Sequence, residues 1–428
     1  MIMKTSAVRL YGKKDLRLEQ FELPPIKEDE ILAKVVSDCI CMSSHKAALQ
    51  GADHKRVPED VAENPIILGH EFSGELIEVG AKWRNSFRVG EKFAIQPNLN
   101  YRDSLYAPGY SYPYIGGNAT YVIIPNEVME HNCLLTYSGK AFFYSSLAEP
   151  ISCIVGAFHT NYHTIPGSYV HDMGIVEGGN VAMLAGAGTM GVGAIDYVIH
   201  CNRKPGMVVV IDIDEERLDR ASQLLTVEEA ARNGVRLVYM NTDDTDTLLN
   251  LTGMRGYDDV FVFAPISTVI ELGDSILGKD GCLNFFAGPT NPVFMASLNF
   301  SNVHYASTHV VGTSGGNTND MLESISMIES GLIDPATMIT HIGGLDCVID
   351  ATLNLDIIPG GKKLIYTHLN MPLIAIAELS KIDDPVFGEL ADIVNRNNGL
   401  WCAEAENFLL GVGCGMWKAE NGIVKLRD

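Results

Sequence analysis

Short apolar runs alternate with segments of helical spacing in the middle of the chain. Residues 181–185 form an apolar run typical of a buried strand, and the following residues show a helical pattern as far as His200. Residues 207–212 predict the next strand and residues 215–225 the next helix. Further strands are predicted at 235–239, 259–263 and 282–286. Strands that alternate with helices predict a parallel, doubly wound sheet, so the fold class is α/β.

The chain on either side of this region has a different pattern. Up to about residue 155, short β-branched runs are separated by Gly and Pro, with strands predicted at 31–36, 74–79 and 121–125. From about residue 311 the β-rich pattern returns, with a helix predicted over 320–331 and a closing strand over 362–366. We therefore expect a β-rich, barrel-like domain before the α/β region and β-rich structure again after it.

The last part of the chain, residues 371–428, is predicted to be a helical extension. Asp384 followed by Pro385 is a typical helix start, with the Asp as N-cap and the Pro in the first helical position. Apolar residues then recur at helical spacing, namely Phe387, Leu390, Ile393 and Val394.

Charge and composition exclude several classes of protein. The net charge of the 428-residue chain is −22, which argues against binding to nucleic acid because phosphate contacts need a basic surface. The nine cysteines are scattered and form no regular framework, so a reducing cytoplasm is the expected compartment. The sequence has no apolar run of transmembrane length and no apolar signal-peptide core near its start. We expect a cytoplasmic protein without a membrane partner.

A glycine-rich loop follows the first strand of the α/β region. Gly186, Gly188 and Gly191 have the spacing of a dinucleotide-binding turn, and Thr189 and Met190 lie between them at the helix start. The free N–H groups of the helix would face the pyrophosphate of the dinucleotide.

The end of the next strand predicts which dinucleotide binds. Asp212 would accept hydrogen bonds from the ribose hydroxyls and repel a 2′-phosphate, which favours NAD over NADP. Arg217 lies nearby and weakens that preference, so NADP stays possible.

Four side chains in the β-rich part have the chemistry of metal ligands. Cys41 offers a thiolate, His70 an imidazole, and Glu71 and Glu149 each offer a carboxylate. This combination suits Zn²⁺ better than Mg²⁺ or Ca²⁺, so one catalytic zinc ion is predicted. Glu149 is in a buried-looking context, where a carboxylate needs a partner such as a metal or its bound water. The sequence does not decide whether Glu71 or Glu149 ligates the zinc directly.

These motifs resemble the medium-chain, zinc-containing alcohol dehydrogenase superfamily. The run Gly69-His70-Glu71-x-x-Gly74-x5-Gly80 is similar to its zinc signature, Cys41 and His70 match its first two zinc ligands, and Glu149 in Leu-Ala-Glu-Pro-Ile-Ser is similar to the polyol dehydrogenases. The segment 399–406, taken with the rest of the chain, is most similar to the sorbose-1-phosphate reductase branch.

The resemblance implies a domain organisation and an assembly. A GroES-like catalytic domain over residues 1–160 and 311–370 would be split around a Rossmann NAD-binding domain over 161–310, with the helical extension over 371–428. The resemblance also implies a homodimer or a homotetramer.

The chain departs from the family pattern in three further segments. Residues 97–115 contain tyrosines but no cysteines, so the second, structural zinc of the family is expected to be absent. Lys46 stands where many relatives carry the His of a proton relay, with His45 one position earlier. Residues 161–179 differ from the usual linker into the first Rossmann strand.

Together these features predict alcohol–ketone redox chemistry. Zinc would polarise a carbonyl, NAD(H) would exchange the hydride, and Ser43 is the candidate to pass a proton to solvent, with Glu71 and Glu149 as the other candidate catalytic residues. The resemblance makes a sugar alcohol or ketose, in phosphorylated form, the expected small-molecule substrate. Lys55 and Arg56 belong to a local basic stretch that could bind its phosphate, although a solvated loop is the alternative.

Two other functions fit parts of the sequence. A zinc-free quinone or enone reductase of the same superfamily would use the dinucleotide loop but would not need the Cys41, His70 and Glu149 set. A non-catalytic NAD-binding protein would keep its cofactor without turning over any polyol.

Overall fold

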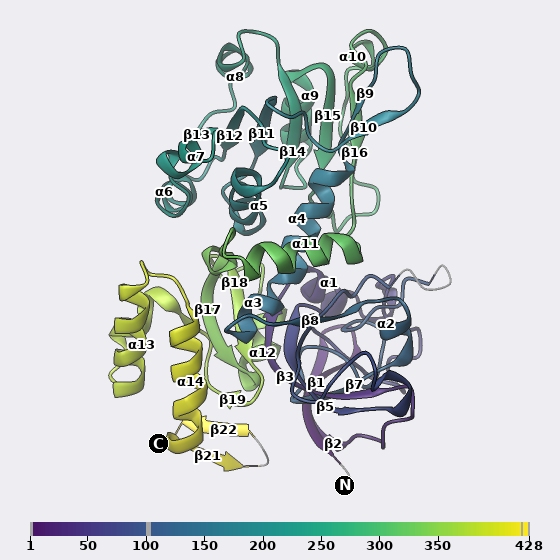
Figure 1. Cartoon of the computed structure of the whole chain (residues 1–428), viewed down its shortest axis with the longest axis vertical. Helices are drawn as coiled ribbons and strands as arrows, with labels where there is room; N and C mark the ends of the chain where they lie inside the picture. The colour runs from purple at the N-terminus through teal and green to yellow at the C-terminus, as the bar shows by residue number, and fades with distance from the viewer. Residues whose placement is uncertain (1–2, 100–103, 421–422, 427–428) are drawn as a thin grey trace. The chain divides into compact units, whose positions relative to one another are not determined.

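The structure is a computed structural model in which residues 3–99, 104–420 and 423–426 are described, with side chains up to residue 411. The chain forms two compact units, the first from residues 1–149 and 339–428 and the second from residues 150–338 (Figure 1). From the sequence we predicted a Rossmann domain over residues 161–310, between the two parts of the catalytic domain. The units differ from that division because two helices, α4 (Ala148–Thr160) and α11 (Thr318–Glu329), interact with the parallel sheet region: Phe158 stacks on Phe261 and Glu323 accepts a hydrogen bond from Tyr197.

The first unit contains the β-rich structure that the sequence predicts. Its main sheet has eight strands. Seven of them run, in spatial order, as β20 (Ile374–Ala375), β17 (Ile339–Gly344), β18 (Lys362–Tyr366), β3 (Ile31–Ile40), β5 (Phe72–Val79), β6 (Lys92–Ile95) and β8 (Leu134–Tyr137). The eighth strand, β7 (Tyr121–Ile124), also pairs with β3. Strand β3 is therefore the centre of the sheet, and β18, which comes more than 300 residues later in the chain, pairs with it antiparallel.

Smaller elements surround this sheet. A second sheet joins β2 (Asp15–Glu22), β1 (Lys4–Gly12) and β4 (Ile66–Ile67). The helices of the first unit before its extension are α1 (Met42–Gln50), α2 (Asn126–Glu130), α3 (Phe142–Ser146) and α12 (Val348–Leu353). Buried apolar residues from β3, β5, β6 and β7 form one core, which includes Ile31, Phe72, Phe93 and Val122.

The chain after residue 370 is mainly helical, as predicted. After the turn η5 (Ile376–Lys381), α13 (Pro385–Arg396) begins at Asp384, whose carboxylate accepts a hydrogen bond from the N–H of Val386 (2.8 Å). Helix α14 (Ala403–Met416) follows, and then β21 (Trp417–Glu420) and β22 (Ile423–Leu426). The sequence did not predict these two strands. Strand β22 pairs with β19 (Leu369–Asn370), and residues 421–422 and 427–428 lie outside the described chain.

The second unit contains the predicted parallel sheet. All six strands are parallel to their neighbours. Their spatial order is β13 (Arg236–Met240), β12 (Met207–Ile211), β11 (Asn180–Leu184), β14 (Tyr257–Val262), β15 (Leu277–Phe285) and β16 (His309–Val311). This order is that of a doubly wound dinucleotide-binding fold, in which the order reverses beside the first strand, β11. Ligands of such sheets bind beyond the carboxyl ends of the strands at this reversal.

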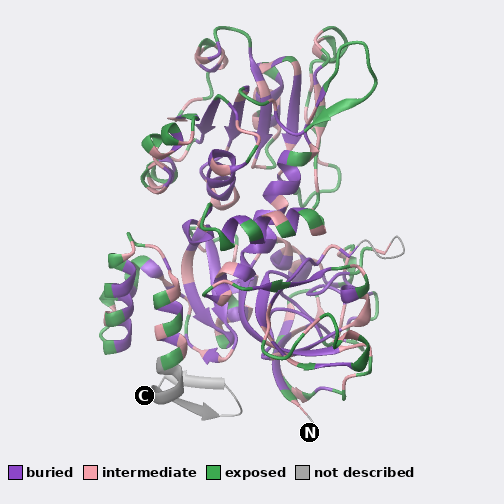
Figure 2. Ribbon diagram, in the orientation of Figure 1, coloured by how far each residue is buried: buried purple, intermediate pink, exposed green. Residues whose placement is uncertain are grey.

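Helices connect the strands of this sheet. They are α5 (Thr189–His200), α6 (Glu215–Leu224), α7 (Val227–Arg232), α8 (Thr245–Leu251), α9 (Ser267–Ile276) and α10 (Phe300–Tyr305). Every residue of β12 is buried, and Figure 2 shows the same for most of the sheet, as expected for parallel strands. The segment before β11, which departs from the family pattern, contains the hairpin β9 (Tyr162–Thr164) and β10 (His171–Met173). Among the described residues, none of the helices is both long enough and apolar enough to span a membrane.

Candidate functional site

Cys41 lies at the end of the central strand of the first unit. Strand β3 ends at Ile40, and Cys41 has extended backbone angles (φ −114°, ψ 149°) at the start of α1. Its carbonyl oxygen accepts the hydrogen bond of His45 N–H (3.1 Å), but its side chain does not cap the helix. The sulfur of Cys41 is therefore left to interact with other groups.

His70 and Glu71 lie in the irregular turn before β5. Gly69 has a φ of +96°, a conformation that favours glycine, and a Cβ there would lie 2.6 Å from Asp38 Oδ2. Gly74 lets β5 approach β3, because a Cβ there would be 1.8 Å from the carbonyl oxygen of Lys34. The two glycines hold this turn against β3, whose end carries Cys41.

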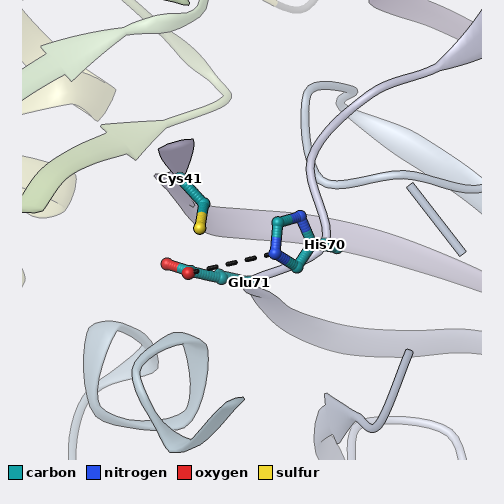
Figure 3. Close-up of side chains that lie close together, drawn as sticks. All are labelled: Cys41, His70 and Glu71. Atoms are coloured by element: carbon teal, nitrogen blue, oxygen red, sulfur yellow. Dashed lines mark ion pairs between the residues drawn. The ribbon is translucent and has the colours of Figure 1, made fainter. Parts of the chain in front are cut away.

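The structure brings three of the predicted ligands together. Cys41, His70 and Glu71 each offer one ligand atom, and these atoms lie within 4.8 Å of one another. Figure 3 shows the three side chains converging, with the line between His70 Nε2 and Glu71 Oε1 marking a separation of 4.0 Å. One thiolate, one imidazole and one carboxylate fit Zn²⁺ by both their chemistry and their separation.

The imidazole of His70 presents one particular nitrogen to this cluster. Nδ1 is hydrogen-bonded to Ser44 Oγ (3.2 Å), whereas Nε2 faces Glu71. A metal-binding histidine is usually held in this way by a partner on its other nitrogen. Burial lowers the pKa of His70, which favours the neutral ring that a metal requires.

Glu71 has a second, cationic partner that the sequence analysis missed. Lys362 Nζ, at the start of β18, contacts both carboxylate oxygens and lies 2.6 Å from Oε2. Both side chains are buried. Burial and the neighbouring Cys41 thiolate raise the pKa of Glu71, and the ammonium of Lys362 opposes this shift. Burial alone would lower the pKa of Lys362, but the Glu71 carboxylate raises it, so the lysine stays charged.

Glu149 lies close to the cluster but is not one of its three members. It is in the first turn of α4 and is 7% exposed. Its negative charge raises the pKa of His70, against the larger effect of burial. The arrangement therefore favours Glu71 over Glu149 as the third ligand atom of the cluster.

Ser43 contacts both the thiolate and the imidazole of the cluster. Its Oγ donates to Cys41 Sγ (3.1 Å) and lies 3.3 Å from His70 Nε2. Tyr110, which the sequence analysis did not select, donates its hydroxyl to Ser43 Oγ (2.7 Å). The tyrosine ring also lies against His70, with ring centroids 4.7 Å apart. The cysteine-free segment 97–115 thus supplies a buried tyrosine beside the cluster.

His45 does not take part in this network. It is buried, and its Nδ1 is hydrogen-bonded to the carbonyl oxygen of Thr352 (2.7 Å). Packing of α1 against α12 therefore accounts for this histidine.

The two candidate phosphate-binding residues differ in position. The guanidinium of Arg56 lies over the ring of Tyr110, 5.4 Å from its centroid, and is only partly exposed. Lys55 is exposed. Burial, and to a smaller extent the charges of Arg56 and Lys55, lower the pKa of His54 to about 4. Of these two residues, Arg56 is the one that lies near the cluster, because it packs on Tyr110.

In the second unit, the glycine loop has the geometry that dinucleotide binding requires. A Cβ on Gly191 would lie 2.0 Å from the carbonyl oxygen of Gly186, so this glycine allows helix α5 to pack against the loop. A Cβ on Gly188 would meet nothing within 4 Å, so the backbone there is open to a ligand. Thr189 and Met190 begin α5, whose N-cap is Gly188. These are the positions at which a pyrophosphate meets the helix N-terminus.

Asp212 follows β12 and reaches the glycine loop. Its Oδ2 accepts the N–H of Ala187 and its Oδ1 the N–H of Asp214, both at 3.1 Å. Arg217 lies on the surface of α6 and pairs with Asp214 (3.2 Å). The carboxylate therefore lies beside the loop, whereas the arginine is held by another acid.

The fold and the site define a class of protein, and comparison with known families gives the same class. The alcohol dehydrogenase GroES-like domain matches residues 27–132, and the zinc-binding dehydrogenase family matches residues 190–330. The chain belongs to this zinc-binding alcohol dehydrogenase family, which confirms the resemblance and the fold class inferred from the sequence. It is an oxidoreductase acting on CH–OH groups, with zinc and a nicotinamide dinucleotide as cofactors.

Particular relatives narrow this class. The chain is 49% identical to mannitol-1-phosphate 5-dehydrogenase of Aliivibrio fischeri over 413 residues, covering 95% of this chain and 97% of that protein. It is 49% identical to L-sorbose 1-phosphate reductase of Klebsiella pneumoniae over 406 residues, with the same coverage. The crystal structure of 2R,3R-butanediol dehydrogenase from Bacillus subtilis has the same fold, with a TM-score of 0.66 at 20% identity over 85% of this chain and 99% of that one.

Proposed function

We propose that this protein is an NAD-dependent dehydrogenase that interconverts a phosphorylated sugar alcohol and the corresponding ketose phosphate, of the D-glucitol 6-phosphate and L-sorbose 1-phosphate type. The observation that carries this proposal is the convergence of Cys41, His70 and Glu71, with the cation of Arg56 beside them over Tyr110. The names of two relatives, a mannitol-1-phosphate dehydrogenase and a sorbose 1-phosphate reductase, support a phosphorylated substrate.

In this proposal the Cys41 thiolate, His70 Nε2 and a glutamate hold one zinc ion. Glu71 is favoured as that glutamate by its place in the cluster, and Glu149 is the alternative. Bound zinc supplies a Lewis acid for the carbonyl or alkoxide oxygen of the substrate. Lys362 offsets the charge of Glu71, so the cluster of Cys41 and Glu71 is less anionic than its two acids alone would make it.

Ser43 is proposed to take up the proton that the substrate hydroxyl loses and to pass its own toward solvent. Its Oγ lies beside both Cys41 and His70, which is where the reacting oxygen would be held. The hydroxyl of Tyr110 orients Ser43 by donating to its Oγ. Proton transfer by a positioned side chain contributes about 10²- to 10⁴-fold in rate.

We propose NAD as the preferred dinucleotide because Asp212 lies beside the glycine loop. Its carboxylate would accept hydrogen bonds from the ribose and repel a 2′-phosphate. Gly186, Gly188, Thr189, Met190 and Gly191 would surround the pyrophosphate. We further propose a cytoplasmic homodimer or homotetramer that has neither a nucleic-acid nor a membrane partner.

We assign the substrate phosphate to Arg56, assisted by Lys55. An arginine binds phosphate through two parallel N–H groups, and its position on an aromatic ring limits the conformations that must be ordered on binding. Lys55 is exposed and contributes charge from the surface.

The test is a panel of sugar alcohols and their phosphates with NAD⁺ and NADP⁺, with and without a chelator, on wild type, Arg56→Met and Lys55→Met. We expect turnover of a hexitol phosphate with NAD⁺, and loss of it when the metal is removed. Arg56→Met should raise KM for the phosphorylated substrate about 10-fold or more, and much more than for the unphosphorylated one, while Lys55→Met has a smaller effect. Equal effects of Arg56→Met on both substrates would contradict the phosphate assignment. Chelator-resistant reduction of a quinone or an enone would instead support the zinc-free reductase.

A further inference from the structure

The C-terminal extension contains a buried glutamate that is bonded to the part of the first unit that carries the candidate metal ligands. Glu406, on α14, has no exposed surface. Its Oε1 accepts the N–H of Phe142 (2.5 Å), and its Oε2 accepts the N–H of Phe143 (2.9 Å) and the hydroxyl of Tyr366 (3.0 Å). A buried carboxylate that accepts three hydrogen bonds from two separate segments fixes those segments relative to one another.

One of these segments is the start of α3, the short helix that leads to Glu149. Helix α3 ends at Ser146, and Glu149 follows in the first turn of α4. The two last residues of α3 connect it to the main sheet. Ser146 Oγ is 2.5 Å from Ser37 Oγ on β3, and Ser145 Oγ is bonded to Ser73 Oγ on β5.

These two strands carry the three clustered residues. Strand β3 leads from Ser37 directly to Cys41, and β5 begins immediately after His70 and Glu71. Helix α3 is thus hydrogen-bonded at its start to Glu406 and at its end to both ligand-bearing strands. Any shift of α3 would be transmitted to the positions of the candidate ligands.

The other segment bonded to Glu406 is strand β18, which also reaches the candidate metal cluster. Tyr366 is the last residue of β18, and Lys362, the first residue of that strand, pairs with Glu71. Trp401, which is also fully buried and lies just before α14, donates its indole N–H to the Tyr366 hydroxyl (2.7 Å). Figure 1 shows α14 beside β18, as these bonds require.

We infer that Glu406 is a positioning residue for the metal centre, and that the extension holds the ligand geometry through α3 and β18. This inference rests on the proposed function, because it takes Cys41, His70 and a glutamate as the ligands. According to this inference, the C-terminal extension helps the protein to retain its metal ion, in addition to any contribution to stability. Groups outside the ligand set usually affect metal affinity about 10- to 100-fold when they are removed.

The test is Co²⁺ binding, followed by absorption, to wild type, Glu406→Gln and Glu404→Gln, each measured well below its unfolding temperature. Glu406→Gln keeps the size of the side chain but places an NH₂ group against an N–H donor of α3 or the Tyr366 hydroxyl. We expect its Kd for Co²⁺ to rise about 10-fold. Glu404 lies on the same helix and pairs with Arg396 at the surface, so Glu404→Gln is the matched control and should leave the Kd unchanged.

A purely structural role would lower the unfolding temperature of Glu406→Gln without changing its Kd, and that result would overturn the inference. The same change of Kd in Glu404→Gln would overturn it too. If Glu406→Gln does not fold, the Kd of Tyr366→Phe for Co²⁺ is measured instead, because this variant removes one of the three hydrogen bonds to Glu406. A Kd at least about twofold above wild type supports the inference, and an unchanged Kd overturns it.

The variant Cys41→Ser separates this inference from the proposed function. If Cys41→Ser binds Co²⁺ as tightly as wild type, the metal centre itself is misassigned and both fail. If Cys41→Ser loses binding while folded Glu406→Gln matches wild type, the role of Glu406 alone is refuted.

Discussion

Lys362 donates a hydrogen bond of 2.6 Å to Glu71 Oε2, although the two residues are 291 positions apart in the chain. The lysine side chain is 5% exposed and the glutamate side chain 1% exposed, so neither charge is solvated. Their positions follow from the sheet: β18 pairs with β3, and β3 pairs with β5, which begins just after Glu71. The pair therefore connects the returning part of the chain to the candidate metal cluster.

We expect Lys362→Met to destabilise the metal-free protein by about 3 to 5 kcal/mol, because it leaves the carboxylate of Glu71 buried without a cation. Urea unfolding of the variant measures this loss. The double variant Lys362→Met with Glu71→Gln should recover most of the stability, because no unpaired charge remains, but it should not recover activity.

Lys381→Met is the matched control for this experiment. Lys381 pairs with Glu378, but its side chain is 69% exposed. Surface ion pairs contribute at most about 1 kcal/mol, so this variant should unfold nearly as wild type does. If Lys362→Met were as stable as Lys381→Met, the buried pair would not be holding the two segments together.

The preference for NAD is expected to depend on Asp212. Asp212→Asn keeps one acceptor for the N–H of Ala187 but loses the charge. KM for NAD⁺ should rise about 10-fold with kcat little changed, because the carboxylate binds the ribose equally in the ground and transition states. The ratio of kcat/KM for NAD⁺ to kcat/KM for NADP⁺ should decrease, since the repulsion of the 2′-phosphate is lost.

Steady-state kinetics with both dinucleotides measure these effects. Asp214→Asn is the control, because Asp214 lies in the same loop but caps α6 through the N–H of Arg217. Asp214→Asn should lower the stability of the protein slightly and should hardly change the KM for NAD⁺. An unaltered KM for NAD⁺ in Asp212→Asn would show that the carboxylate only fixes the loop.

Ser43 and Ser44 are neighbours with different expected roles. Ser43→Ala should lower kcat about 100-fold in metal-saturated enzyme and alter the dependence of kcat on pH, because Ser43 moves the proton. Ser44→Ala should instead weaken metal binding, because Ser44 holds the other nitrogen of His70 (3.2 Å). Kinetics over a range of pH, with metal content measured on the same samples, distinguish the two. If metal-saturated Ser43→Ala had the kcat and the pH profile of wild type, Ser43 would not be the proton carrier.

Local sequence signals predicted the fold well because each of them acts over a few residues. The glycine loop before α5 and the Asp384 cap of α13 depend on backbone geometry that only a few residue types satisfy. The apolar runs of the parallel strands are equally local. By contrast, β21 and β22 were not predicted, although the dipeptide Asn421-Gly422 between them in the sequence is typical of a two-residue hairpin turn. The whole segment was instead assigned to the helical extension.

The site was predicted only where its chemistry is recognisable in sequence. Cys41, His70 and Glu71 stand in a motif, so they were selected, and the structure brings them together. Lys362 and Tyr110 were not predicted, because each contacts the site through a hydrogen bond to a residue far away in the chain, Glu71 and Ser43 respectively. A signal for Lys362 existed, since a lysine at the start of a buried strand needs a counter-charge. For Glu406, nothing local distinguishes a buried acid from its exposed neighbour Glu404.

His163, in the second unit, is expected to make stability depend on pH. Its Nε2 is 3.1 Å from Asp259 Oδ1 and its Nδ1 is 3.0 Å from the carbonyl oxygen of Asp280. Both partners are acceptors, so only the doubly protonated ring satisfies both. Burial is the largest single effect and lowers the pKa of His163, but the hydrogen bonds and negative charges of Asp259 and Asp280 together outweigh it, so the pKa is raised above 6.5.

A raised folded-state pKa stabilises the protein fully below the unfolded value and loses this effect as the pH rises through the folded-state value. His163→Gln should therefore lower the free energy of unfolding by about 3 kcal/mol near pH 6 and by clearly less near pH 9. Thermal unfolding at the two pH values measures the difference. His304→Gln, which changes an exposed histidine on α10, should have little effect at either pH. If the penalty of His163→Gln were the same at both, the ring would be neutral in the folded protein, and its pairing with Asp259 would stabilise the second unit only as an ordinary hydrogen bond.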